Sequence, residues 1–156
     1  MLISEKHSLI MDKSDSLFTA PGVKVLIVDD FRTNLHVAKR LMKQYNMDID
    51  LCSSGEAAIE AAQSVRYDLI FMDHRMPGID GIEATKLIRA ISDKDPYYKN
   101  IPIIALSANT VSGIKEMFIE NGLNDFISKP INTAKLHEIL KKWIPKEKQI
   151  TAKNYP

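Results

Sequence analysis

Short apolar runs alternate with longer segments of helical periodicity from residue 23 to residue 144 of this chain. The runs have the length of strands, and between them apolar residues recur at three- and four-residue steps, as in amphipathic helices. The runs occupy residues 23–28, 48–52, 69–72, 101–106 and 125–128. Strands that alternate with helices in this way predict an α/β fold, a doubly wound, five-stranded parallel sheet of (βα)5 type.

Four of these runs end at polar residues that suit one chemical site. Asp29 and Asp30 follow the first run, Asp73 the third, Ser107 the fourth, and Lys129 the fifth. Because the carboxyl ends of parallel strands meet at one edge of a sheet, where open α/β folds bind ligands, we expect these side chains to lie together. Three carboxylates, a hydroxyl and an ammonium group suit a Mg²⁺ ion and a phosphoryl group.

Asp73 is the expected nucleophile, because a carboxylate can attack phosphorus to form an aspartyl phosphate. Asp30 and Asp73 are expected to bind Mg²⁺ directly, and Asp29 directly or through water. Lys129 would neutralise a phosphoryl oxygen, while the Ser107 hydroxyl and nearby backbone N–H groups would donate to the others. Each residue alone indicates little, and only their joint placement at strand ends makes the hypothesis specific.

Composition and charge restrict the class of partner. A formal net charge of +1 implies no strong attraction to nucleic acid or to a membrane surface, so neither contact is expected. No apolar stretch approaches the ~20 residues that span a bilayer, and residues 1–10 contain Glu5 and Lys6, unlike a signal peptide. A cytoplasmic location is therefore expected.

Two further side chains are predicted to take no part in the site. The single Cys52 cannot form an internal disulfide and is predicted to be a buried, inert thiol. His74 is predicted to face away from Asp73, because side chains at adjacent strand positions point to opposite faces.

Three regions are predicted along the chain. Residues 1–22 lack a steady period and form a leader or linker, residues 23–144 form the domain, and residues 145–156 form a polar C-terminal tail that is expected to be frayed. Within the domain, residues 92–100 are polar, contain Asp95-Pro96 and are predicted to be a loop.

Helix starts are also visible in the sequence. The stretch Ser53-Ser54-Gly55-Glu56 has the spacing of a capping box. Asp80 and Asn132 each precede a helical stripe and are predicted N-caps.

The quoted motifs resemble the receiver domain of two-component response regulators. They are Asp29-Asp30, Asp73 within MDHRMPGIDG, Ser107-Ala108 and Lys129-Pro130, and the resemblance covers residues 23–144. It implies a flavodoxin-like fold, Mg²⁺, and transfer of a phosphoryl group to Asp73 from the phosphohistidine of a histidine kinase or a histidine phosphotransfer protein. The stretches TNLHVAKRL (33–41) and ALSAN (105–109) are most similar to receivers of hybrid sensor histidine kinases, so the chain is expected to be a fragment of a longer kinase.

The resemblance also implies roles for individual residues. The backbone carbonyl of Arg75 would complete the metal shell, and backbone groups of Arg75 and Ala108 would bind the phosphoryl group. Ser107 would move toward that group and Phe126 would turn inward, which would switch protein–protein contacts. We also predict a cis Lys129–Pro130 bond, because the strand must end abruptly for the ammonium group to turn back into the site.

Two other functions stay open at this point. One is a phosphohydrolase that uses Asp73 as its nucleophile, although haloacid-dehalogenase-type enzymes normally place a second Asp where this chain has Arg75. The other is a docking module that takes no phosphate, which the intact acidic set disfavours. The sequence shows no glycine-rich nucleotide loop and no conventional enzyme active site, and it leaves a homodimer open.

Overall fold

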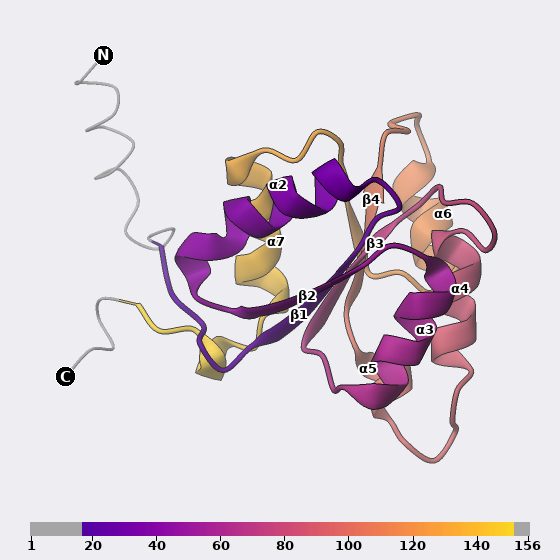
Figure 1. Ribbon diagram of the computed structural model, residues 1–156, viewed down its shortest axis with the longest axis horizontal. Coiled ribbons are helices and arrows are strands. Elements are labelled where there is room, and N and C mark those ends of the chain that lie inside the picture. Colours follow the sequence, from indigo (N-terminus) through magenta and orange to yellow (C-terminus); the bar gives the residue numbers. More distant parts are fainter. Residues whose placement is uncertain (1–16, 152–156) are drawn as a thin grey trace.

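The computed structural model describes residues 17–151, which form a five-stranded parallel sheet between two layers of helices (Figure 1). The strand order is β2-β1-β3-β4-β5, which confirms the predicted doubly wound sheet. The strands are β1 (Lys24–Val28), β2 (Asp48–Cys52), β3 (Leu69–Asp73), β4 (Ile103–Ser107) and β5 (Asp125–Ser128).

Helices follow the strands and cover both faces of the sheet. They are α2 (Arg32–Met42), α3 (Gly55–Ser64), α4 (Gly81–Arg89), α5 (Tyr97–Asn100), α6 (Ile114–Glu120) and α7 (Thr133–Trp143), with short 3₁₀ turns η2 (Lys43–Tyr45) and η3 (Lys146–Lys148). Helices α2 and α7 pack on one face, and α3, α4 and α6 pack on the other (Figure 1). No helix within residues 17–151 is long and apolar enough to cross a membrane.

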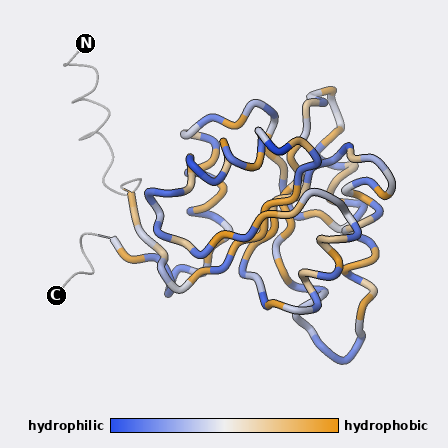
Figure 2. Tube along the Cα trace, in the orientation of Figure 1, coloured by the Kyte–Doolittle hydropathy of each residue, from blue (hydrophilic) through white to orange (hydrophobic). Residues whose placement is uncertain are grey.

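The alternation of side chains along the strands produces the two halves of the core. In β1, Val25 and Ile27 face α2 and α7, while Leu26 and Val28 face the opposite layer. Every residue of β3 and β4 is buried, as expected of strands covered on both sides. Figure 2 shows this as apolar strands inside more hydrophilic helices.

Two of the three predicted helix N-caps lie where the sequence predicts them, and the third differs by one residue. Asp80 accepts a hydrogen bond from the Glu83 N–H (2.9 Å), and Asn132 accepts one from the Lys135 N–H (2.8 Å), so both predicted N-caps are confirmed. The N-cap of α3 is Ser54, whose hydroxyl accepts from the Ala57 N–H (3.0 Å). The capping-box spacing from Ser53 was therefore wrong by one residue.

The predicted loop at 92–100 contains a short helix, α5, so that prediction was wrong at its C-terminal end. Asp95 accepts a hydrogen bond from the Tyr97 N–H (3.1 Å) and so supports the first turn. The Tyr97 hydroxyl then accepts from the Tyr67 N–H (2.8 Å) at the start of the segment leading into β3. A tyrosine that bonds to distant backbone gives this turn a tertiary anchor that local polarity does not reveal.

The two ends of the described chain meet beside the sheet. Thr19 and Ile150 form an antiparallel bridge with N–H···O distances of 2.9 and 2.8 Å. Phe18 is only 3% exposed and packs against Tyr45, with ring centroids 5.1 Å apart. The expected fraying of the tail is thus wrong for residues 145–151. The predicted boundary at residue 22 stays a prediction, and residues 1–16 and 152–156 lie outside the described part.

Replacing Phe18 with alanine should destabilise the fold by roughly 3 kcal/mol, because a buried ring is exchanged for a cavity. Urea denaturation of the full chain measures the change. Leu17→Ala is the matched control, since Leu17 is 57% exposed and its loss should cost little. Equal stabilities of the two variants would mean that the segment before β1 adds nothing to the core.

Candidate phosphoacceptor site

The predicted site residues meet at the carboxyl edge of the sheet. Asp73 is the last residue of β3 and Ser107 the last of β4, while Asp29 follows β1 and Lys129 follows β5. The Lys129 ammonium nitrogen lies 2.8 Å from a carboxylate oxygen of Asp73 and 3.0 Å from one of Asp29. Strand order explains this convergence, because β1, β3, β4 and β5 are successive neighbours in the sheet.

Three carboxylates form the acidic part of the site. One oxygen from each of Asp29, Asp30 and Asp73 lies within 4.8 Å of the other two. Asp29 and Asp73 are buried, and Asp30 is exposed at the mouth. Up to three negative charges therefore surround a single ammonium group. A hard divalent cation with oxygen ligands fits this donor set, so the residues present suit Mg²⁺.

Two hydrogen bonds at the start of α2 fix the Asp29 carboxylate. One Asp29 oxygen accepts from the Phe31 N–H (2.9 Å), and the other accepts from the Asn34 side-chain amide (3.2 Å). The sequence analysis missed Asn34, which lies in the first turn of α2. Its signal was its position four residues after Asp30, close enough for a first-turn side chain to reach back to the acidic pair.

Electrostatics set the protonation of the phosphoacceptor candidate. The pKa of Asp73 is raised to about 6, mainly by burial and also by the neighbouring Asp29 and Asp30, while Lys129 acts in the opposite direction. For Lys129, burial lowers the pKa, but Asp73 and Asp29 outweigh it, and the net pKa is raised. With a pKa of about 6, the Asp73 carboxyl is mostly ionised at neutral pH, beside the raised pKa of the Lys129 ammonium group.

Ser107 is buried and bonded within its own loop. Its hydroxyl accepts from the Asn109 N–H (3.0 Å) and donates to the Asn109 carbonyl (3.3 Å). Phe126 is half-buried on β5 and packs against Phe118 of α6, with ring centroids 5.9 Å apart. The proposed movements of Ser107 and Phe126 stay predictions. The predicted cis Lys129–Pro130 bond is confirmed.

The two residues expected to act through their backbone lie at the mouth. The side chains of Arg75 and Ala108 are both exposed; Arg75 lies two residues after the end of β3, and Ala108 directly follows β4. Their roles toward metal and phosphoryl oxygens stay predictions.

His74 is buried and packs edge-on against Phe118 with centroids 5.0 Å apart, so it faces away from Asp73 as predicted. Cys52 is half-buried, and burial raises its pKa to about 11, which keeps the thiol protonated.

Gly81 supports the site in a way that the sequence analysis missed. A Cβ atom there would lie 2.2 Å from the carbonyl oxygen of Asp73, so any side chain would push the end of β3 out of place. The Gly81 N–H also donates to the His74 carbonyl (2.9 Å). The available signal was the glycine that ends MDHRMPGIDG.

Segments of known histidine kinases are similar in sequence to this chain. The chain is 36% identical over 124 residues to the signal transduction histidine-protein kinase BarA of Escherichia coli strain K12, a match that covers 80% of this chain and 13% of that protein. It is 37% identical over 122 residues to hybrid signal transduction histidine kinase I of Dictyostelium discoideum, covering 75% of this chain and 7% of that protein. The chain therefore spans a small part of the curated relatives it matches.

Solved structures share the fold of this chain. The receiver domain of sensor histidine kinase PA1611 from Pseudomonas aeruginosa PAO1, with magnesium in its active site cleft, is 36% identical with a TM-score of 0.69, over 78% of this chain and 97% of that one. The receiver domain in the Saccharomyces cerevisiae Ypd1–Ssk1 complex is 28% identical with a TM-score of 0.73, over 82% and 91%. Residues 25–141 match the response regulator receiver domain family, and the chain belongs to that family.

Proposed function

We propose that this chain is a phosphoacceptor domain of a two-component phosphorelay, in which Asp73 receives a phosphoryl group from the phosphohistidine of a partner protein. The observation that supports this most is the buried Asp73 carboxylate, held by Lys129 and flanked by Asp29 and Asp30. An Asp73 oxygen forms the new bond to phosphorus as the P–N bond of the donor breaks, and the bonding electrons return to the imidazole.

Mg²⁺ is the cofactor of this proposal, and Asp29, Asp30, Asp73 and the Arg75 carbonyl would hold it. When bound, it offsets the charge that builds up on the phosphoryl oxygens. Lys129, already 2.8 Å from Asp73, provides a second cation for the same purpose. The Ser107 hydroxyl and the backbone N–H groups of Arg75 and Ala108 would donate to the remaining oxygens.

The output of the domain would be a change of surface. Ser107 would exchange its bonds with Asn109 for one with the phosphoryl group. Ser107 ends β4, which pairs with β5, and β5 carries Phe126. The ring of Phe126 packs on Phe118 of α6, so the movement would reach the surface of α6 and α7. This switch would regulate contacts with other proteins.

The donor we propose is a histidine kinase or a histidine phosphotransfer protein, and the chain itself is proposed to be a receiver from a hybrid histidine kinase. The similarity to BarA and to the Dictyostelium hybrid kinase supports this context. The structure of the Ypd1–Ssk1 complex supports the class of partner. A cytoplasmic location belongs to the same proposal, while a homodimer and the absence of a nucleic-acid partner stay predictions.

The function is tested by incubating the protein with acetyl phosphate and Mg²⁺ and measuring its intact mass. We expect one phosphoryl adduct in the wild type and none in Asp73→Asn, because only Asp73 lies beside both the acidic pair and Lys129. Circular dichroism must show that the variant is folded. Sustained release of phosphate without an adduct would favour the phosphohydrolase, and an unmodified wild type would favour the docking module.

Mg²⁺ should stabilise the wild type more than Asp30→Asn, because a ligand that binds only the folded state adds to stability and the variant has lost a charged ligand. Without metal, Asp30→Asn should be more stable than the wild type by roughly 1 kcal/mol, since one of three repelling charges is gone. Urea denaturation with EDTA or Mg²⁺ measures both. Glu120→Gln, exposed on α6, is the control and should alter neither value.

Metal-free stability should also depend on pH through Asp73. Its pKa rises from 3.8 to about 6 on folding, so the folded state favours the protonated form. The wild type should therefore lose stability as the pH rises from about 4 to about 6, and each unit of pKa difference is worth about 1.4 kcal/mol. Asp73→Asn should lack this loss. Parallel urea titrations in EDTA compare the two, and identical pH profiles would contradict the raised pKa.

A further inference from the structure

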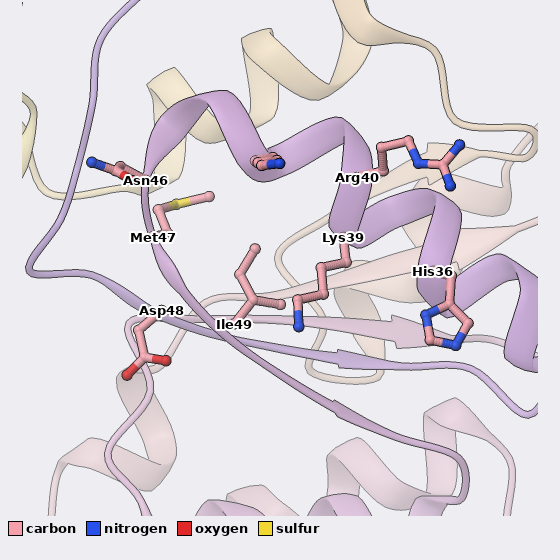
Figure 3. Close-up of a pocket in the computed structure, with 8 residues that line it drawn as sticks. His36, Lys39, Arg40, Asn46, Met47, Asp48 and Ile49 are labelled. Atoms are coloured by element: carbon pink, nitrogen blue, oxygen red, sulfur yellow. The ribbon is translucent and has the colours of Figure 1, made fainter.

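A groove of about 740 Å³ lies between α2 and the edge strand β2 (Figure 3), and Asp73 is not among its lining residues. One wall is formed by His36, Lys39 and Arg40 of α2 and by Lys43 at the start of η2, spaced at helical intervals. The other includes Met47 and Ile49, which are half-buried. Figure 3 shows His36 and Lys39 projecting from the helix toward the strand.

The wall on α2 carries uncompensated positive charge. No acidic residue occurs between residues 31 and 47, although the whole chain has a net charge of only +1. Within residues 17–151, none of the three fixed cations Lys39, Arg40 and Lys43 forms an ion pair with an acidic side chain. Asp48 is the one acidic residue among those that line the groove, and its carboxylate lies 2.7 Å from the Lys24 ammonium nitrogen. The groove therefore favours an acidic occupant.

The strand beside this wall has an open edge. β2 pairs with β1 on one side and has no other strand neighbour among the described residues. The backbone N–H of Asp48 donates to the Val23 carbonyl, and the backbone carbonyl of Cys52 accepts from the Asp29 N–H. Alternate residues of β2 therefore bond to β1. The N–H and C=O groups of Ile49 and Leu51 consequently point outward, as a row that a further strand can pair with.

We propose that this groove binds an acidic, extended polypeptide segment of a partner protein, which adds to β2 as a sixth strand. Its carboxylates would face Lys39 and Lys43, and its apolar side chains would cover Met47 and Ile49. The opposite face of the added strand would lie beside the side chains of Asp48 and Asp50 and would be uncharged. Strand addition supplies affinity through the backbone, and the charged wall supplies specificity. The proposal is independent of phosphorylation at Asp73.

The probe is the capped peptide Glu-Thr-Val-Thr-Glu-Thr-Val-Thr-Glu, which places glutamate and valine on one face and threonine on the other. Titration of the full chain, followed by amide NMR, should shift residues 47–52 and slow hydrogen exchange at Ile49 and Leu51. A peptide with lysine in place of glutamate should not bind. No shift at millimolar peptide, or equal binding of the lysine peptide, overturns the proposal.

Two N-methylated peptides test the strand itself. One is methylated at the threonine amides and the other at the glutamate and valine amides, so each lacks N–H groups on one edge only. An added strand uses one edge, so one peptide should bind and the other should not. Equal binding of both, or equally tight binding of polyglutamate, would show recognition of charge alone. Protection of Ile49 and Leu51 before any peptide is added would mean that the edge is already covered. Each of these results overturns the proposal.

Charge-reversed variants test the wall. Lys39→Glu with Lys43→Glu should weaken binding of the glutamate peptide about tenfold or more, as expected from the loss of two ion pairs and the gain of two repulsions. Lys86→Glu with Lys94→Glu is the matched control, because both lysines are exposed elsewhere and the change in net charge is the same. Equal weakening in both variants would indicate only long-range charge and would reject the groove.

Discussion

The contact of Lys129 with Asp73 and Asp29 is the interaction on which this site depends. Without the ammonium group, the buried carboxylates of Asp29 and Asp73 would face each other at the end of the sheet without the cation that now bonds to both. With it, the pair is tolerated but the negative charge is not balanced, and burial still raises the pKa of Asp73. The site is thus built to be completed by a cation, and its stability is linked to its ligand.

The fold brings these charges together through strand order. β1 and β4 flank β3, and β5 lies beside β4, so residues distant in sequence end on one edge. This much could be predicted, because buried parallel strands leave continuous apolar runs and their polar ends mark the edge. The N-caps at Asp80 and Asn132 were predictable for a similar reason, since a cap is a local hydrogen bond.

The features that the sequence did not reveal depend on contacts between distant residues. α5 forms where a polar loop was expected, because the Tyr97 hydroxyl meets the Tyr67 backbone. Phe18 is buried and Thr19 pairs with Ile150, although each segment alone has no steady period. Asn34 and Gly81 are invisible to periodicity as well, because their roles are one hydrogen bond to Asp29 and one close approach to the Asp73 carbonyl.

The bridge between Thr19 and Ile150 has a mechanical consequence. It ties the two ends of the described chain at the edge where the strands begin, whereas Asp73 lies where β3 ends (Figure 1). Because the two hydrogen bonds of the bridge join the segments before β1 and after α7, a pull on the chain outside them would act on the bridge before it acted on the strands. The carboxyl edge of the sheet lies at the other end of the strands, so tension at the joined ends would not act on Asp73 directly.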